Sequence, residues 1–409
     1  MLDIKLLREE PERVKNGVKN KGADPKLVDR FLAADVTWRK LTEETEKIRA
    51  EQKKASEARD VARGKELKAE VQEKETKLRE LEEERNDILD KLPNVPFDNA
   101  PIGKDDTFNK VLREVGEKPD FNFPIKDYLS LSEPNLIDVE RASKVSGSRF
   151  GYLKNEAVFL EFALVDLAMK TLVAEGFTPV IPPVMVRPEV MKGMGKVKFL
   201  EDKDAFYLPE DNLYLVGSSE HSIGPMYGNE VLKLDELPRR YVGFSTCFRR
   251  EAGSYGKDTK GILRVHQFDK VEMFSFTTPQ ESVKEHKLFL ALQEKLMQAL
   301  KLPYRVVAIA TGDMGWGDAE QFDIETWLPG ENRYRETQSC SNTTDFQARG
   351  LNIKHRAVDG KTEFVHTLNG TAFAIGRILV AIFENYQTKE GKINIPKVLQ
   401  AYVGKKVIG

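Results

Sequence analysis

Cysteine and histidine are scarce in this sequence. Its 409 residues include two cysteines and five histidines. Cys247 and Cys340 form no CxxC pair, and the histidines show no HExxH motif or other paired-ligand spacing. We therefore expect no structural zinc.

Long hydrophobic runs are also lacking. The two most apolar stretches are AVFLEFALVDLAM, which Glu161 and Asp166 interrupt, and TAFAIGRILVAIF, which Arg377 interrupts. Neither is long enough to span a bilayer. The N-terminus, MLDIKLLREEPERV, carries acids and has no apolar core region, so it does not have the pattern of a secretory signal. We expect a cytoplasmic protein that does not enter a membrane.

The chain has no strong net charge. Its formal charge of −2 argues against a protein that coats nucleic acid without specificity, but it does not exclude local basic surfaces. The chain is 40% hydrophobic and 32% charged, which is typical of a soluble globular protein. At this length it can form two or more domains, each with its own core.

Residues 38–92 have the pattern of two long helices. Seam positions, of which two in the second helix are charged (Lys74 and Arg85), recur at alternating spacings of three and four, which predicts that the two helices bury a common seam. A short turn near 62–65, with Gly64 as the helix breaker, would fold them into an antiparallel coiled-coil hairpin. The seam positions are 38, 41, 45, 48, 52 and 55 in the first helix and 67, 71, 74, 78, 81, 85, 88 and 92 in the second.

The far end of this hairpin is basic. Between Lys47 and Lys68 there are eight basic and four acidic residues, a local charge of +4 on a chain of net charge −2. Most charges on such helices simply face solvent. A stalk with a basic far end, however, suits contact with a phosphate backbone.

A proline-rich segment follows, LPNVPFDNAPIG at 92–103, and we place a domain boundary there. The chain beyond it has helical patterns near 156–175 and 280–300. Several of its strand-like stretches are joined by connections too short for a parallel crossover, which favours an α+β fold with an antiparallel sheet and helices packed on one side. These stretches are 213–219, 239–251, 265–276, 304–311, 321–328, 334–340 and 362–368.

Neither common glycine-rich nucleotide loop is present. GKT at 360–362 lacks the glycine that a P-loop needs at 355, and neither GMG nor GWG completes GxGxxG. The stretch CFRREAGSYGKDTKGILRVHQFDKVEMF at 247–274 carries glycines, arginines and lysines between two strand-like flanks. Glycine lets backbone amides approach an anion, which Arg and Lys can neutralise.

Strand alternation sorts the side chains of the two flanks. If Phe244, Phe248, Val271 and Met273 cover the core, the other face presents Arg249, Glu251, Phe268 and Glu272. Such a set can bind a nucleotide, because an arginine pairs with phosphate, an aromatic ring stacks on a base and an acid accepts from an exocyclic amine. The alternative is cross-strand ion pairing on a solvated sheet face.

Arg377 is the only charge in its apolar segment. A buried guanidinium without a counter-anion is costly, and a bound phosphate would supply that anion. The alternative is an arginine at a helix edge whose charged head reaches water.

Several motifs together resemble class II aminoacyl-tRNA synthetases, and in particular the seryl-tRNA synthetases of bacterial type without zinc. Residues 248–274 resemble motif 2 within a segment 244–274, GFTPVIPP at 176–183 resembles motif 1, and TLNGTAFAIGRILVAIFENYQ at 367–387 resembles motif 3. ETQSCSN at 336–342, GSRFGYL at 147–153 and the hairpin match in the same order. The resemblance covers essentially the whole chain.

The resemblance implies a class II catalytic core over 104–409 and an N-terminal tRNA-binding domain over 1–103, with its coiled-coil arm at about 27–92. It also implies ATP with Mg²⁺ as cofactor. Arg249 would hold the α-phosphate and Arg377 the outer phosphates, and these two would be the catalytic residues. The full ATP-binding set is Arg249, Arg250, Glu251 at the adenine amine, Val265, Phe268 under the ring, Glu336, Thr337, Gln338, Ser339 and Arg377, with Glu336 and Ser339 also on the magnesium.

For the amino acid, the family's Thr-x-Glu element falls at Ser218, Ser219 and Glu220. Ser218 departs from the usual threonine, and Gln338 stands where the family often has a small residue. A hydroxyl substrate needs polar partners that alanine would leave unsatisfied, a task that Glu272 and Thr371 suit. The implied serine-binding set is Ser218, Ser219, Glu220, Glu272, Thr371, Arg249 and Asn369.

The resemblance implies serine–tRNA ligation: serine and ATP form seryl-adenylate, and the seryl group passes to the 3′ end of tRNA(Ser), with tRNA(Sec) as a further candidate. It also implies a homodimer formed through motif 1, and we expect the loop at 252–264 to move and to meet the acceptor end of tRNA. The alternatives are an amino acid to carrier-protein ligase, which would lack the arm, and a non-catalytic RNA-binding paralogue, which would lose charged site residues. The arm residues that we assign to tRNA are Lys53, Lys54, Arg59, Arg63 and Lys65.

Overall fold

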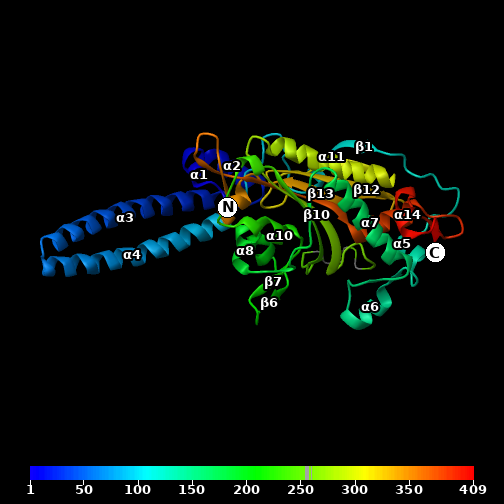
Figure 1. The fold of residues 1–409 in the computed structure, drawn as a ribbon, viewed down its shortest axis with the longest axis horizontal. Helices are drawn as coiled ribbons and strands as arrows, with labels where there is room; N and C mark the ends of the chain where they lie inside the picture. The colour runs from blue at the N-terminus through cyan, green and yellow to red at the C-terminus, as the bar shows by residue number, and fades with distance from the viewer. Residues whose placement is uncertain (254–257, 259) are drawn as a thin grey trace. The chain divides into compact units, whose positions relative to one another are not determined.

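The computed structural model describes residues 1–253, 258 and 260–409. The chain divides into two compact units, Met1–Val95 and Pro96–Gly409 (Figure 1).

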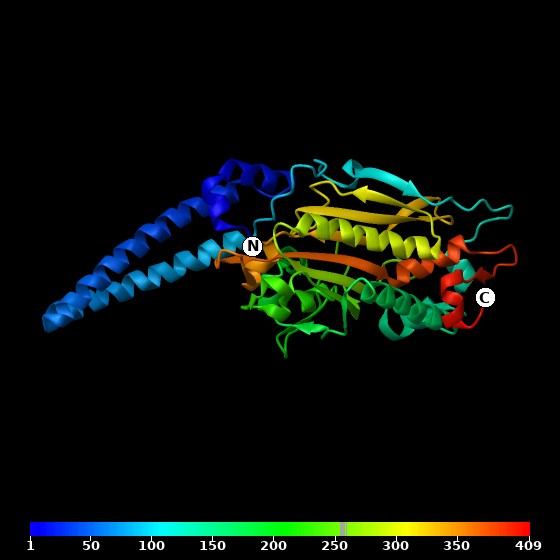
Figure 2. The ribbon, with the colours of Figure 1, turned by 45° about the horizontal axis from the view of Figure 1, so that its top comes forward.

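The N-terminal unit is helical. Two short helices, α1 (Ile4–Glu9) and α2 (Pro11–Asn20), precede the long helices α3 (Lys26–Glu57) and α4 (Val61–Asp90). The long helices pack against each other as an antiparallel pair (Figures 1 and 2). Apolar seam positions such as Leu67 and Val71 are buried between them, which confirms the predicted coiled-coil hairpin.

The turn of the hairpin lies earlier than predicted. Helix α3 ends at Glu57 and α4 begins at Val61, so Gly64 is inside the first turn of α4 and the prediction of a break at Gly64 was wrong. Two local features decide this. Arg59 adopts a left-handed backbone with φ 57°, and the Asp60 side chain accepts a hydrogen bond from the Arg63 amide, which caps α4.

Near the other end of the hairpin, one buried carboxylate holds three arginines. Asp35 is fully buried, with Arg8 and Arg85 at 2.8 Å and Arg39 at 3.0 Å from its oxygens. The Arg85 guanidinium also lies 4.3 Å from the centre of the Trp38 ring. Burial opposes ionisation of Asp35, but the hydrogen bond from Arg8 and the three positive charges lower its pKa below the usual value. Asp35 therefore connects α1, α3 and α4.

Removing this carboxylate should destabilise the N-terminal unit. We expect Asp35→Ala to lower the free energy of unfolding by about 3 kcal/mol, because it leaves the Arg85 charge buried without a partner. Urea unfolding followed by far-UV circular dichroism measures this. Asp29→Ala is the matched control, since Asp29 is 61% exposed in its pair with Lys15 and should contribute less than about 1 kcal/mol. Equal losses in the two variants would contradict the role of Asp35.

The C-terminal unit is built on an eight-stranded sheet with the order β1-β11-β12-β13-β16-β10-β9-β4. All neighbours are antiparallel except β4 and β9, which confirms the predicted α+β class with an antiparallel sheet. The strands are β1 (Lys110–Val115), β4 (Thr178–Val180), β9 (Arg239–Phe248), β10 (Gln267–Thr277), β11 (Tyr304–Ala308), β12 (Glu320–Leu328), β13 (Arg333–Asn342) and β16 (His366–Ala374).

Short elements complete the unit. Its helices are α5 (Tyr128–Ser132), α6 (Val139–Ser146), α7 (Glu156–Val173), α8 (Pro188–Gly193), α9 (Val197–Glu201), α10 (Glu220–Ile223), α11 (Ser282–Leu300), α12 (Phe346–Leu351), α13 (Ile375–Asn385) and α14 (Lys397–Val403). The remaining strands are β2 (Ile137–Asp138), β3 (Tyr152–Leu153), β5 (Met185–Val186), β6 (Tyr207–Leu208), β7 (Leu213–Leu215), β8 (Val231–Leu232), β14 (Lys354–Arg356), β15 (Thr362–Phe364), β17 (Ile393–Asn394) and β18 (Val407–Ile408).

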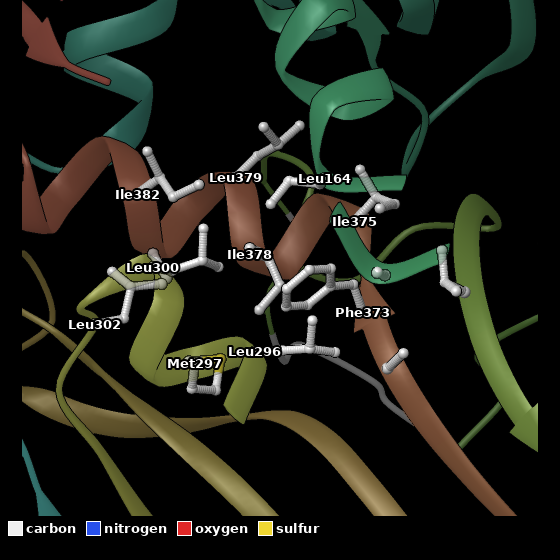
Figure 3. Packing of buried hydrophobic residues seen from close by; sticks show 14 of the residues in the cluster. Leu164, Leu296, Met297, Leu300, Leu302, Phe373, Ile375, Ile378, Leu379 and Ile382 are labelled. Atoms are coloured by element: carbon white, nitrogen blue, oxygen red, sulfur yellow. The ribbon is translucent and has the colours of Figure 1, made fainter. Parts of the chain in front are cut away.

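Helices α7, α11 and α13 pack on the sheet and share one core with it. Figure 3 shows Ile378 of α13 close to Leu296 of α11 and Phe373 of β16, and Leu379 close to Leu164 of α7. Val271 and Met273 of β10 belong to the same core, as strand alternation predicts. In the part of the chain that the structure describes, no helix is long and apolar enough to cross a membrane.

Several predicted strands differ from the observed ones. The stretch 362–368 is divided between β15 and β16, which belong to different sheets, and the stretch 304–311 ends as a strand at Ala308. The stretch 239–251 ends as a strand at Phe248, and Glu251 has a left-handed φ of 54°, so Arg249 and Glu251 follow β9 rather than alternate along it. The stretch 213–219 forms a strand only at Leu213–Leu215, because the serines after it lead into α10.

Candidate active site

A pocket opens over the centre of the sheet, where β9, β10, β13 and β16 lie side by side and α13 begins. Arg249 enters it just after β9 ends, while Phe268 and Lys270 come from β10. The lining residues are Arg249, Glu251, Ile262, Leu263, Arg264, Val265, Phe268, Lys270, Glu336, Thr337, Gln338, Thr371, Ala374, Gly376 and Arg377.

Arg249 and Phe268 lie together in the pocket. The Arg249 guanidinium lies 5.5 Å from the centre of the Phe268 ring, and its Nε donates to the Gly217 carbonyl at 3.2 Å. These contacts fix a cation beside an exposed part of an aromatic ring. That arrangement can hold a phosphate next to a stacked base.

Glu251 is held by Arg264. The Arg264 Nη1 donates to the Glu251 carboxylate at 2.5 Å, and both residues line the pocket. The glycine and lysine loop between them includes residues 254–257 and 259, which lie outside the described residues, so the predicted movement of this loop stays a prediction.

Arg377, in the first turn of α13, is paired in the pocket. Its Nη1 donates to the Glu336 carbonyl at 3.0 Å and lies 3.1 Å from a Glu336 carboxylate oxygen. The side chain is 22% exposed. Glu336 therefore supplies a counter-anion to Arg377, because folding brings β13 beside the start of α13. The charged head of Arg377 lines the pocket, and its contact with a bound phosphate stays a prediction.

A second group of polar residues lies where α10 begins. Ser218 and Ser219 are buried, and the Glu220 carboxylate lies 2.8 Å from Lys196 Nζ. Burial opposes ionisation of Glu220, yet Lys196, followed by His221, lowers its pKa well below the usual value.

Glu272 and Thr371 meet across the β10–β16 ladder. The Thr371 hydroxyl donates to Glu272 Oε2 at 3.0 Å, and Lys270 Nζ lies 2.7 Å from the same oxygen. Burial raises the pKa of Glu272, and the Lys270 charge offsets part of this rise. A carboxylate and a hydroxyl presented side by side suit a small hydroxylated ligand.

Two family models match the chain. Residues 1–96 match the seryl-tRNA synthetase N-terminal domain, and residues 205–386 match the class II core domain of the tRNA synthetases for G, H, P, S and T. The whole chain also aligns with a serine–tRNA ligase of Acidothermus cellulolyticus at 48% identity, covering 100% of this chain and 99% of the relative. The chain belongs to the seryl-tRNA synthetase family.

Solved structures of seryl-tRNA synthetases share the fold over the full length. The enzyme from Pyrococcus horikoshii, crystallised with ATP, matches with a TM-score of 0.94 and 41% identity, covering 100% of this chain and 99% of that one. The cytoplasmic serine–tRNA ligase of Naegleria fowleri, in complex with AMP, matches with a TM-score of 0.90 and 32% identity, covering 100% and 98%.

The structure brings together most of the side chains that the seryl-tRNA synthetase resemblance assigned to ATP. Two of these side chains lie elsewhere. The Arg250 side chain donates to the Ala205 carbonyl at 3.1 Å and covers the Phe206 ring. Ser339 is not part of the pocket lining, and its hydroxyl accepts a hydrogen bond from the Gln321 side chain. The predicted ATP residues that line the pocket are Arg249, Glu251, Val265, Phe268, Glu336, Thr337, Gln338 and Arg377.

The residues assigned to serine form two clusters. One holds Ser218, Ser219 and Glu220, and the other joins Glu272 to Thr371. Asn369 pairs with Phe274 and Ser341 in the sheet and is not part of the pocket lining.

Three residues of the site were missed from the sequence. Lys270 shares a strand face with Phe268 and Glu272, so alternation could have found it. Lys196 stands in a stretch without a motif. Tyr128 comes from the segment after the domain boundary, and its hydroxyl accepts from the Ile262 amide at 2.9 Å, which anchors the end of the motif 2 loop.

The assigned basic residues of the arm lie around its far turn. Lys53 and Lys54 end α3, Arg59 is in the turn, and Arg63 and Lys65 begin α4. Arg63 is paired with Glu66 at 2.8 Å and with Glu51 at 3.5 Å, so part of its charge is balanced within the arm.

Proposed function

We propose that this chain is a serine–tRNA ligase. It activates L-serine with ATP to form seryl-adenylate and pyrophosphate, and then transfers the seryl group to the 3′ end of tRNA(Ser). One observation carries this most strongly: an aromatic and arginine-lined pocket adjoins two acid and hydroxyl clusters, in a chain that aligns end to end with serine–tRNA ligases.

In the first step the serine carboxylate attacks the α-phosphorus of ATP, and the bond to the pyrophosphate oxygen breaks. Arg249 binds the α-phosphate and draws charge from it as the pentacoordinate transition state forms. Arg377 holds the outer phosphates. The reaction needs no side-chain nucleophile, so positioning and charge supply most of the acceleration.

Phe268 carries the adenine on its face, with Val265 beside it and Glu251 accepting from the exocyclic amine. Since Arg264 pairs with Glu251 at 2.5 Å, ATP binding must share or displace that contact. In the second step the terminal adenosine hydroxyl of tRNA attacks the seryl carbonyl and AMP leaves.

The hydroxyl of serine binds Glu272 and Thr371, and its ammonium binds Glu220. Alanine would leave the buried Glu272 carboxylate without the hydroxyl, which is costly, and a tight pocket excludes the extra methyl of threonine. These contacts support serine as the amino acid.

Mg²⁺ fits the oxygen-rich end of the site. Burial and the nearby Glu336 raise the pKa of Asp323 well above its usual value, so a cation bound here would relieve carboxylate repulsion. Glu336 and Ser339 would hold Mg²⁺, which neutralises the triphosphate when bound. Within the residues that the structure describes, no three His, Cys, Asp or Glu side chains are grouped so as to hold a metal by themselves.

Glu336→Gln should raise the Mg²⁺ concentration needed for half-maximal pyrophosphate exchange by roughly 10-fold, since an anionic ligand is lost. A Mg²⁺ titration at saturating ATP and serine measures this. Glu325→Gln is the control, because Glu325 pairs with Arg305 at 2.5 Å and is not part of the pocket lining. An unchanged titration for Glu336→Gln would remove Glu336 from the metal site.

The remaining expectations belong to the same proposal. The domains are 1–103 for tRNA binding and 104–409 for catalysis, the location is cytoplasmic, and tRNA(Sec) is a further candidate substrate. Exposed apolar side chains on and near motif 1, namely Phe159, Phe162 and Ile181, support a homodimer.

The carrier-protein ligase is not favoured, because residues 1–96 match the seryl-tRNA synthetase N-terminal domain. The non-catalytic paralogue is not favoured either, because Arg249, Glu251, Glu272 and Arg377 are all present. Serine-dependent exchange of labelled pyrophosphate into ATP tests the proposal. Exchange should require serine and should not be supported by alanine, and a folded chain without exchange would contradict it.

A further inference from the structure

Lys196 reaches the amino acid side of the site from outside the family motifs. It lies between α8 and α9, directly after Gly195. Gly195 has a left-handed φ of 70°, and a side chain at this position would clash with the Phe346 ring. The Lys196 amide bonds to the Met191 carbonyl at 3.0 Å. Its side chain is only 25% exposed and ends 2.8 Å from Glu220 Oε1. Lys196 is therefore fixed at its backbone by the hydrogen bond to Met191 and at its ammonium group by the ion pair with Glu220.

The two oxygens of Glu220 have different surroundings. Oε1 contacts Lys196 and lies 3.3 Å from His221 Nε2, whereas Oε2 is buried with no hydrogen-bond partner. The buried Ser219 hydroxyl, on the preceding residue, is also unpartnered. Buried polar atoms are almost always satisfied, so the unpartnered Glu220 Oε2 is available to a ligand donor.

His221 does not supply the positive charge. Its Nδ1 accepts from the Gly217 amide at 3.2 Å, so the ring proton is on Nε2 and points to Glu220. Burial lowers the pKa of His221 to about 4, with the Lys196 charge adding to the effect. The imidazole is thus neutral at working pH, and Lys196 is the cation paired with Glu220.

We propose that Lys196 is a positioning residue for amino acid activation, which holds Glu220 ionised and turned so that Oε2 receives the α-ammonium group of the substrate. This rests on the proposed serine activation. Lys196 occupies one carboxylate oxygen and leaves the other for the substrate, so it does not compete for the ammonium.

The charges around Glu220 show why a lysine is needed. Lys270 also lies near Glu220, but it is engaged by Glu272 at 2.7 Å, and Arg249 is committed to the nucleotide side. Glu272 is itself a buried acid whose pKa the charge of Glu220 helps to raise. The charge of Asp318, after that of Glu220, helps to keep Lys196 protonated against its burial. Without Lys196, burial and Glu272 would favour protonated Glu220, which cannot balance an ammonium.

Lys196→Met tests this in the full-length chain. We expect the KM for serine in pyrophosphate exchange to rise at least 10-fold at pH 6.5, with the KM for ATP unchanged. The defect should shrink as the pH rises towards 9, because Glu220 then ionises without the lysine. Lys196→Arg keeps the charge and should recover most of the affinity for serine.

Lys198→Met is the matched control. Lys198 is 51% exposed and pairs with Asp202 at 3.2 Å, so its loss should leave both KM values unchanged. The inference is overturned if Lys196→Met has a normal KM for serine, or if it raises both KM values equally at every pH, as a purely structural defect would. A wild-type chain without serine-dependent exchange would overturn the proposed function as well, which distinguishes the two failures.

Discussion

Arg249→Ala should lower the rate of serine-dependent pyrophosphate exchange by roughly 10³-fold or more, the scale seen when an arginine that stabilises a phosphoryl transition state is removed. The structure places the guanidinium over Phe268 and fixes it through the Gly217 carbonyl, so the proposed contact with the α-phosphate would cost little conformational freedom. The loss should be mainly in kcat, because charge builds on the α-phosphate in the transition state.

Two further variants make this result specific. Arg249→Lys keeps the charge but loses the planar fork, so it should recover only part of the activity. Arg305→Ala removes a half-buried arginine that pairs with Glu325 at 2.5 Å on the same sheet, and it should stay close to wild type. Exchange by Arg249→Ala within 10-fold of wild type, with a normal far-UV spectrum, would exclude the assigned role.

Shortening the arm should separate the two half-reactions. When residues 46–73 are replaced by a short Gly-Ser turn, we expect serine-dependent exchange to stay within twofold and tRNA charging to fall by roughly 10²-fold or more, since phosphate contacts dominate nucleic acid affinity. This boundary keeps the pair of Lys74 with Glu44 at 2.9 Å, and it keeps the arginine cluster on Asp35. The remaining hairpin can therefore still close.

Charge variants refine that experiment. Replacing Lys53, Lys54, Arg59, Arg63 and Lys65 by glutamine keeps the helices, and it should weaken charging and reduce its dependence on salt. The matched control replaces Arg30 and Lys91, at the other end of the hairpin, by glutamine, so that positive charge is lost away from the far turn. Normal charging by the shortened protein would refute the arm's role in tRNA binding.

Local sequence pattern accounts for much of the fold. The alternating three and four spacing predicted the α3–α4 pair, and strand alternation placed Val271 and Met273 in the core, because both depend only on which residues of one element share a face. The local sequence pattern failed at the hairpin turn, where a helix cap decided which residues form the turn. Gly64 suggested a helix break, but Asp60 and the left-handed Arg59 fixed the turn at 58–60, four to six residues before Gly64.

The sequence by itself determined which residue types could do the chemistry: arginines for phosphate, an aromatic ring for a base and acids for amines, all within recognisable motifs. Only the tertiary structure decided which other side chains these residues contact. Glu336 lies 41 positions before Arg377 and Lys196 lies 24 before Glu220, yet each pair is in contact. Such pairs depend on the sheet order and on loop paths, which no local spacing encodes, and they set the charge of the site.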